Sequence, residues 1–198
     1  FVGVIGLAVV VGVWELTKRL EERKGIRAPF VPLAVGGAAM VVAGYARGAE
    51  GAWVAMALTA LAVLVWRMTE RPENYLRDVT AGVFTAFYVP FLATFVAMML
   101  AADDGHRRVL VFLLLTVVSD TGAYAVGWRF GTHKLAPRIS PNKTVEGLAG
   151  GVVAGVLVAL AMAPLAGASL VELPLVAVAA LVTVLFSVIG DLFESLLK

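Results

Sequence analysis

Long apolar runs separated by short polar intervals constrain this chain more than any other feature of its sequence. A helix that crosses a bilayer needs roughly 20 mostly apolar residues, and most of these runs come close to that length. Hydrophobic residues make up 61% of the 198 positions and charged residues 15%, whereas a soluble domain is about half apolar and about a quarter charged. These values exclude a disordered chain and an ordinary soluble enzyme. The sequence therefore predicts an all-α polytopic membrane protein.

We expect about seven transmembrane helices in this chain and more in the full protein, because both ends of the sequence look cut. The chain starts at Phe1, already inside an apolar run, and stops at Lys198 within a predicted helix. The interval 47–50 is short enough to predict a tight helical hairpin. The predicted spans are 1–16, 30–46, 51–68, 79–102, 108–130, 147–166 and 173–197.

The basic residues predict the orientation of these spans. Cytoplasmic loops of membrane proteins carry an excess of Lys and Arg. Of the 16 basic residues, 13 lie in one set of segments: the intervals 17–29, 69–78 and 131–146, the ends of the spans beside them, and the C-terminal end. The other three are Arg47, Arg107 and Arg108. We therefore expect the first set on the cytoplasmic side of the cell inner membrane. The net charge of +2 makes nucleic acid an improbable partner.

Asp120 lies near the middle of the fifth predicted span. An ionised carboxylate there costs at least a few kcal/mol unless it faces a polar cavity or a partner. Thr116, Asp120, Tyr124 and Trp128 are spaced by four and share one helix face. Two interpretations stay open, a functional acid and a structural acid that hydrogen-bonds between helices.

The last predicted span ends in a polar stripe. Asp191, Glu194, Ser195 and Lys198 occupy positions i, i+3, i+4 and i+7, which lie on one side of a helix. Carboxylate oxygen suits Mg²⁺, and a hydroxyl and an ammonium suit phosphate. The pattern favours a magnesium–phosphate site, and the alternative is a helix end whose charges simply meet water.

The interval 131–146 is basic and contains two prolines. Lys134, Arg138 and Lys143 supply the charge, and Asn142 or Thr144 could cap the helix that follows. The N–H groups at a helix start, together with Lys143, would form an anion site. A basic loop can also serve membrane topology alone, so both interpretations stay open here.

Three segments together resemble one enzyme family. They are S-D-T-G-A-Y at 119–124, H-K-L-A-P-R-I-S-P-N-K-T-V-E-G at 133–147 and G-D-L-F-E-S-L-L-K at 190–198. In this order they resemble bacterial phosphatidate cytidylyltransferases (CDP-diacylglycerol synthases), over roughly 110–198. The family signature continues with Lys-Asp, His-Gly-Gly and Asp-Arg-x-Asp elements that these 198 residues do not contain. The resemblance implies that a downstream Asp would share a metal centre with Asp191.

The resemblance implies nucleotidyl transfer from CTP to phosphatidate in phospholipid biosynthesis, giving CDP-diacylglycerol and pyrophosphate. It implies Mg²⁺ as cofactor, leaves room for a second, monovalent cation, and leaves homodimerisation open. We expect residues 1–108 to form a scaffold and 109–198 to form the catalytic part. The candidate catalytic residues are Asp191, Lys143, Asp120 and Lys198, with Asp191 as metal ligand, and the candidate substrate-binding residues are Ser140, Thr144, Arg138, Ser195 and Glu194.

Two other functions are compatible with the same acids. An ion-coupled transporter or a channel would use Asp120 and Asp191 as relay groups, although discontinuous helices and inverted repeats are not evident in the sequence. A non-catalytic membrane subunit is the other alternative, because the C-terminal signature of the family is incomplete in these residues. A CDP-alcohol phosphotransferase is disfavoured, because its D-G-x-x-A-R signature is absent from the sequence.

Overall fold

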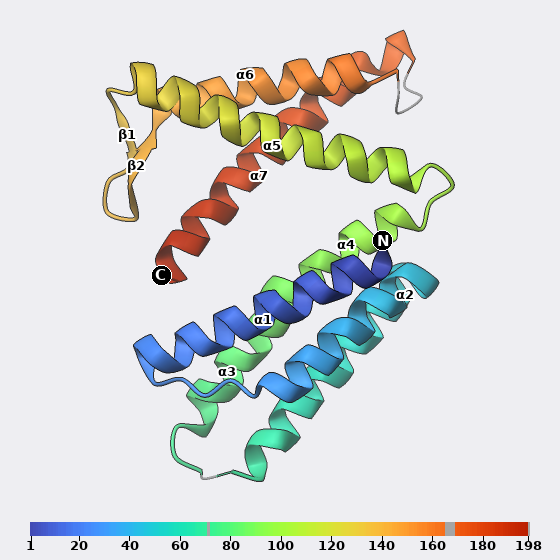
Figure 1. Cartoon of the computed structure of the whole chain (residues 1–198), viewed down its shortest axis with the longest axis vertical. Coiled ribbons are helices and arrows are strands. Elements are labelled where there is room, and N and C mark those ends of the chain that lie inside the picture. The colour runs from blue at the N-terminus through green and yellow to red at the C-terminus, as the bar shows by residue number, and fades with distance from the viewer. Residues whose placement is uncertain (71, 165–168, 198) are drawn as a thin grey trace. The chain divides into compact units, whose positions relative to one another are not determined.

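The computed structural model describes residues 1–70, 72–164 and 169–197, and they form helices joined by short connections and one β-hairpin (Figure 1). The chain divides into two compact units, Phe1–Gly105 and His106–Lys198. The first unit contains α1 (Val2–Lys24), α2 (Phe30–Met68), α3 (Tyr75–Ala86), the π-helix η1 (Phe87–Phe91) and α4 (Leu92–Leu100). The second contains α5 (Gly105–Phe130), β1 (Lys134–Ala136), β2 (Ser140–Thr144), α6 (Val145–Met162), the 3₁₀-helix η2 (Leu170–Glu172) and α7 (Leu173–Leu197).

An all-α polytopic membrane protein is confirmed, but the predicted count of about seven spans is not. Among the described residues, five helical segments are long and apolar enough to cross a membrane: Phe30–Met68, Tyr75–Leu100, Gly105–Phe130, Val145–Met162 and Leu173–Leu196. Helix α1 is not among them, because every 18-residue stretch of it includes Glu15, Lys18 and Arg19. The count also falls because the second and third predicted spans form one helical segment.

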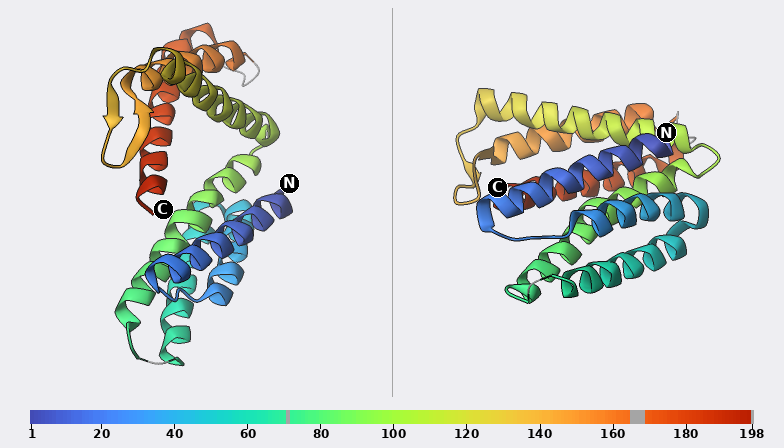
Figure 2. Two further views of the ribbon diagram at one scale, coloured as in Figure 1. Left: turned by 60° about the vertical axis from the view of Figure 1, so that its left-hand side comes forward. Right: turned by 60° about the horizontal axis from the view of Figure 1, so that its bottom comes forward.

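That segment, α2, turns back on itself at Gly48. This residue has non-helical backbone angles (φ 64°, ψ −146°), and the positive φ favours glycine. An unbroken helix of 39 residues would be roughly 58 Å long, about twice the thickness of a hydrocarbon core. The turn instead produces two antiparallel halves of near-spanning length (Figures 1 and 2). They pack closely, because a Cβ at Gly36 would collide with Thr59.

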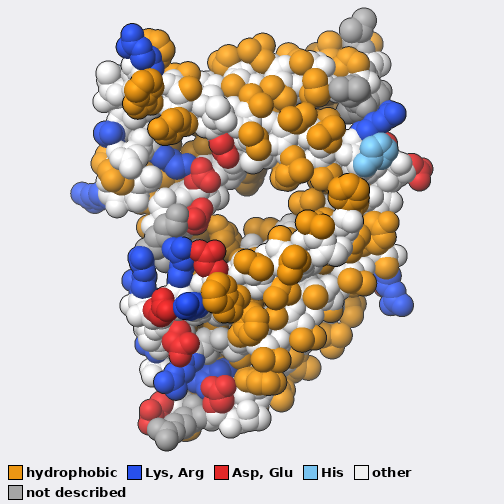
Figure 3. Space-filling view, viewed as in Figure 1, with side chains coloured by type: hydrophobic (Ala, Val, Ile, Leu, Met, Phe, Trp, Pro, Cys, Tyr) orange, Lys and Arg blue, Asp and Glu red, His pale blue; other side chains and the backbone are white. Residues whose placement is uncertain are grey.

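The core of the first unit is apolar and lies where α1, both halves of α2 and η1 meet. Leu33, Met40 and Val13 are fully buried there, and Phe91 is 3% exposed. Pro90 lies within η1, and proline cannot donate the hydrogen bond of a regular helix. The π-turn accommodates this residue inside the long apolar run. The apolar residues outside the core cover the helix surfaces (Figure 3), as expected for side chains that face lipid.

A buried ion pair fixes the charged end of the first unit. Arg67 Nη2 lies 2.8 Å from Asp78 Oδ2, and each side chain is 3% exposed. Asp78 Oδ1 also accepts a hydrogen bond from the backbone N–H of Arg27 at 3.1 Å, and Arg77 Nη2 donates to the carbonyl of Gly25 at 2.6 Å. Two of the predicted cytoplasmic intervals, 17–29 and 69–78, therefore meet at one end of this unit.

Small residues let α5 and α6 pack closely in the second unit. A Cβ at Gly122 would lie 2.6 Å from Cβ of Ala154, and one at Gly151 would lie 3.0 Å from Cβ of Ala123. Helix α7 packs along α6, where a Cβ at Gly155 would lie 2.7 Å from Cγ2 of Val184. Such close approach of backbones is typical of helices that associate in lipid.

Candidate functional site

The basic interval 131–146 forms a β-hairpin between α5 and α6. Strands β1 and β2 pair antiparallel, with Lys134 opposite Thr144 and Ala136 opposite Ser140. The N–H of Val145 donates to the carbonyl of His133 at 2.9 Å and so extends the pairing to the start of α6. We predicted a loop here, because the strands are too short for their alternation to be recognised. The register shifts between these two pairs, and Lys143 lies in β2 one residue before the helix cap.

Thr144 joins the hairpin to α6. Its Oγ1 accepts a hydrogen bond from the N–H of Gly147 at 3.1 Å, and it is the N-cap of the helix. The side chain is 7% exposed and is enclosed by the end of α5, since a Cβ at Gly127 would lie 3.0 Å from its Oγ1. The sequence predicted Asn142 or Thr144 as the cap of this helix, and the structure has Thr144. Its hydroxyl oxygen is engaged by the N–H of Gly147. Contact with substrate stays a prediction for this residue.

Lys143 and Asp191 form the central contact of the site. The ammonium of Lys143, on β2, is paired with Oδ2 of Asp191, on α7. The two residues are 48 positions apart in the sequence, and both side chains are partly exposed, at 27% and 45%. The structure thus joins two of the three sequence segments through opposite charges. Both groups are accessible enough to leave this ion pair and bind other charged partners.

Asp120 lies on the exposed side of α5, and its charged neighbours are Asp191 and Lys143. The predicted structural alternative needs a hydrogen bond from another helix to Asp120, and none is found among residues 1–70, 72–164 and 169–197. The adjacent hydroxyls are used within α5, where Ser119 donates to the carbonyl of Thr116 and Thr121 to that of Val117. All three segments therefore contribute one charged side chain to the same neighbourhood.

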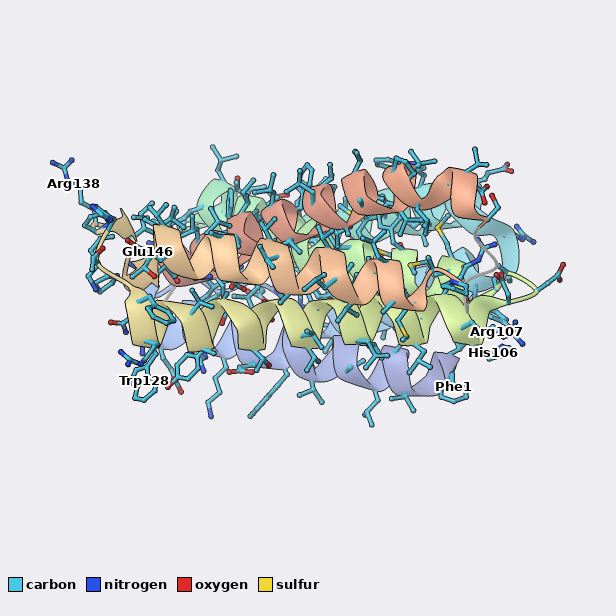
Figure 4. The ribbon with its side chains drawn as sticks, turned by 90° about the horizontal axis from the view of Figure 1, so that it is seen from above. Phe1, His106, Arg107, Trp128, Arg138 and Glu146 are labelled. Atoms are coloured by element: carbon cyan, nitrogen blue, oxygen red, sulfur yellow. The ribbon has the colours of Figure 1, made fainter. Side chains whose placement is uncertain are left out.

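The other predicted residues lie around this neighbourhood or beyond it. Ser195 is one turn after Asp191, and its Oγ donates to the carbonyl of Asp191 at 2.9 Å. Glu194 is exposed on the same helix and Ser140 is half-buried at the start of β2. Arg138 projects from the end of the hairpin (Figure 4) and has no place in the central contact. Lys198 lies outside the described residues.

Sequence analysis missed Glu146 as a site residue. It stands in the first turn of α6, and its carboxylate accepts hydrogen bonds from Thr132 and His133, which lie just before β1 at the base of the hairpin. An acidic residue in the first turn of a predicted helix was the available signal. This signal does not reveal that the carboxylate accepts hydrogen bonds from residues 13 and 14 positions earlier in the sequence.

The donors at this site fit a magnesium ion that substrate helps to hold. Within the described part of the chain, no group of three or more His, Asp or Glu side chains could hold a metal ion. Asp120 and Asp191 supply two neighbouring carboxylates. Mg²⁺ in phosphoryl-transfer enzymes is commonly bound by one or two carboxylates, waters and substrate phosphates. The two acids match that arrangement and do not form an all-protein metal site.

Comparison with known proteins gives one consistent result. Residues 1–198 match the family described as "Cytidylyltransferase family". The chain is 34% identical over 213 residues to phosphatidate cytidylyltransferase of Mycobacterium bovis, covering 100% of this chain and 68% of that protein. It is 36% identical to the protein of that name from Mycobacterium leprae, covering 96% of this chain and 65% of the relative. The chain thus spans about two thirds of the length of these relatives.

Proposed function

The chain belongs to the cytidylyltransferase family, and we propose that the protein transfers the cytidylyl group of CTP to phosphatidate. The products are CDP-diacylglycerol and pyrophosphate, so the protein is a nucleotidyltransferase of phospholipid biosynthesis. The family match favours this function over the transporter and the non-catalytic subunit. The observation that carries the proposal to individual residues is the ion pair between Lys143 and Asp191, beside Asp120.

In the proposed reaction, an oxygen of the phosphatidate phosphate attacks the α-phosphorus of CTP. The new P–O bond forms as the bond to the bridging oxygen of the β-phosphate breaks, and pyrophosphate leaves with that electron pair. No general base is needed, because phosphatidate is already anionic at neutral pH. Catalysis then depends on positioning two polyanions and reducing their repulsion.

The charged and polar side chains of the second unit suit that task. Lys143 is a cation on a short, anchored strand, and it would contact the triphosphate. Ser140, Ser195 and Arg138 are candidates for further phosphate contacts, and the roles predicted for Glu194 and Lys198 from the sequence stay part of the proposal. Asp191, with Asp120 beside it, would hold Mg²⁺, which supplies positive charge to phosphoryl oxygens when bound. A second, monovalent cation and homodimerisation stay predictions.

We also propose that the chain crosses the cytoplasmic membrane seven times with the hairpin in the cytoplasm. Helix α1 and the two halves of α2 would each be one span. Two observations support this topology. The predicted cytoplasmic intervals 17–29 and 69–78 meet in the first unit. In the second unit, Arg138 and Arg107 lie at opposite ends (Figure 4).

The test is an assay of the purified full-length protein with radiolabelled CTP and phosphatidate in mixed micelles containing Mg²⁺. We expect label in CDP-diacylglycerol and release of one pyrophosphate for each lipid formed. Diacylglycerol, which lacks the phosphate nucleophile, is the control substrate and should give no labelled lipid. Absence of labelled product from phosphatidate would contradict the proposed function.

A further inference from the structure

Four hydrogen-bonding contacts converge on the carboxylate of Glu146 at the base of the β-hairpin. Its Oε1 accepts from Oγ1 of Thr132 at 2.7 Å and lies 2.6 Å from Nδ1 of His133. The backbone N–H of His133 lies 3.1 Å and 3.2 Å from the two carboxylate oxygens. The Glu146 side chain is 24% exposed, whereas that of His133 is 80% exposed. The contacts join the segment that enters the hairpin to the helix that leaves it.

These contacts do not serve mainly to start α6. The N-cap of that helix is Thr144, whose hydroxyl already accepts from Gly147. The packing of α5 on α6 depends on small residues further along both helices, such as Gly122 against Ala154. Glu146 also lies in the first turn, where a carboxylate is favourable beside the positive end of the helix dipole. Removal of its side chain should therefore loosen the hairpin and leave the helix pair assembled.

The hairpin that Glu146 closes carries Lys143. Lys143 stands three residues before Glu146, on the strand that pairs with β1, and its ammonium reaches Asp191 on α7. A short two-stranded hairpin has little stability of its own. Contacts at its base consequently determine how well the position of Lys143 is defined.

We infer that Glu146 is a positioning residue for Lys143, acting through Thr132 and the backbone N–H of His133. The inference deepens the proposed function and depends on it, because the ligand that Lys143 would meet is the triphosphate of CTP. Glu146 itself does not contact substrate. Its carboxylate ties the residues that precede β1 to the first turn of α6, so that the ammonium of Lys143 is held where it meets Asp191.

The test compares Glu146→Ala with Glu146→Gln in the full-length protein. Loss of the acceptors in Glu146→Ala should raise the KM for CTP about tenfold or more, with a smaller change in kcat, since a mobile lysine binds phosphate less well. The KM for phosphatidate should change less. Glu146→Gln keeps a carbonyl oxygen that can accept from Thr132 and His133, so it should recover most of the CTP affinity. His133→Ala removes the ring and keeps the backbone N–H, and should have the smaller effect of the two alanine variants.

Limited trypsin digestion supplies a readout that does not need activity. The hairpin contains cleavage sites at Lys134 and Arg138, and Glu146→Ala should be cut there several-fold faster than the unchanged protein. Thermal stability should fall only slightly, by the loss of the favourable contact with the helix dipole. An unchanged KM for CTP in an active Glu146→Ala enzyme would overturn the inference. A loss of activity that is explained by a smaller amount of folded protein would also overturn it, as would a loss that Glu146→Gln does not recover. Failure of the proposed function would look different, because the unchanged protein would then not turn over CTP at all.

Discussion

At the scale of single residues, an ion pair in the second unit identifies the partner of an acid for which the sequence predicts only that a partner exists. The cost of leaving a carboxylate in lipid predicts partners for Asp120 and Asp191, but it does not identify them. Lys143 lies 48 positions before Asp191, and no periodic pattern links a strand residue to a helix residue over that distance. The resemblance grouped these residues by family, and the structure adds the ion pair between two of them.

Asp191→Asn should abolish formation of CDP-diacylglycerol in the full-length protein. The amide keeps the size of the side chain but loses the charge that pairs with Lys143 and would hold Mg²⁺, so turnover should fall on the order of 10³-fold or more. Turnover and thermal stability are measured together across a Mg²⁺ titration. Asp103→Asn, an exposed acid outside the site, is the matched control and should keep full activity. Near-normal turnover of Asp191→Asn with unchanged Mg²⁺ dependence would remove Asp191 from the metal site.

The carboxylates around Arg67 should differ greatly in their contributions to stability. Asp78 is 3% exposed and pairs with Nη2 of Arg67, whereas Glu70 is 42% exposed and pairs with Nη1 of the same residue. Asp78→Asn removes the buried counter-charge of Arg67 and leaves only the exposed Glu70 as its partner, and should cost about 3–5 kcal/mol. Glu70→Gln should cost under about 1 kcal/mol, because water screens an exposed pair.

Unfolding of both variants by denaturant in detergent micelles measures the difference. The comparison keeps the arginine and the type of substitution constant. The two carboxylates then differ in burial and in the further hydrogen bond that Asp78 accepts from the N–H of Arg27. Equal losses of unfolding free energy in the two variants would show that the buried pair adds no more than the exposed one. The sequence analysis counted the basic residues here only as markers of topology and made no prediction for Asp78 or Glu70, because the sequence does not show which charges are buried.

At the scale of elements, the helices could be predicted and the hairpin could not. Apolar runs of near-spanning length specify helices directly, since lipid leaves no other partner for backbone N–H and C=O groups. Strands β1 and β2 are three and five residues long, and Pro141 lies inside β2, where proline argues against a strand. The π-turn at Phe87–Phe91 was also missed, although Pro90 marks the place where a regular helix must be interrupted.

Close packing of α5 on α6 gives a prediction at this scale. A Cβ at Gly122 would lie 2.6 Å from Cβ of Ala154 and 3.2 Å from the carbonyl oxygen of Gly150. Gly122→Ala must therefore push the two helices apart and should cost about 1–3 kcal/mol, despite the higher helix propensity of alanine. The effect is measured by thermal unfolding in detergent, with the loss of monodisperse protein as the signal.

Gly6→Ala on α1 is the control for that experiment. A Cβ at Gly6 has no heavy atom within 4 Å, so the propensity gain is not opposed there and stability should be unchanged or slightly higher. If Gly122→Ala were as stable as Gly6→Ala, the two helices would not be in the close contact that the structure describes.

At the scale of the whole molecule, the distribution of charge should determine how the chain crosses the membrane. The basic intervals alternate with neutral ones along the sequence, with 13 basic residues in one set and three in the other. Within the first unit, two intervals of the basic set meet. Within the second, the hairpin and the start of α5 are at opposite ends. Each unit is thus internally consistent with one orientation.

Cysteine labelling tests that orientation, because these 198 residues contain no cysteine. We expect Arg107→Cys to react with a membrane-impermeant maleimide added to intact cells, since the positive-inside rule places this start of α5 outside. Arg138→Cys, at the end of the hairpin, should react only after the cells are permeabilised. Both positions are exposed to solvent, so a difference in labelling reports the side of the membrane and not burial. Labelling of Arg138→Cys in intact cells with protection of Arg107→Cys would reverse the topology, and a hairpin on the outer side would have no access to cytoplasmic CTP.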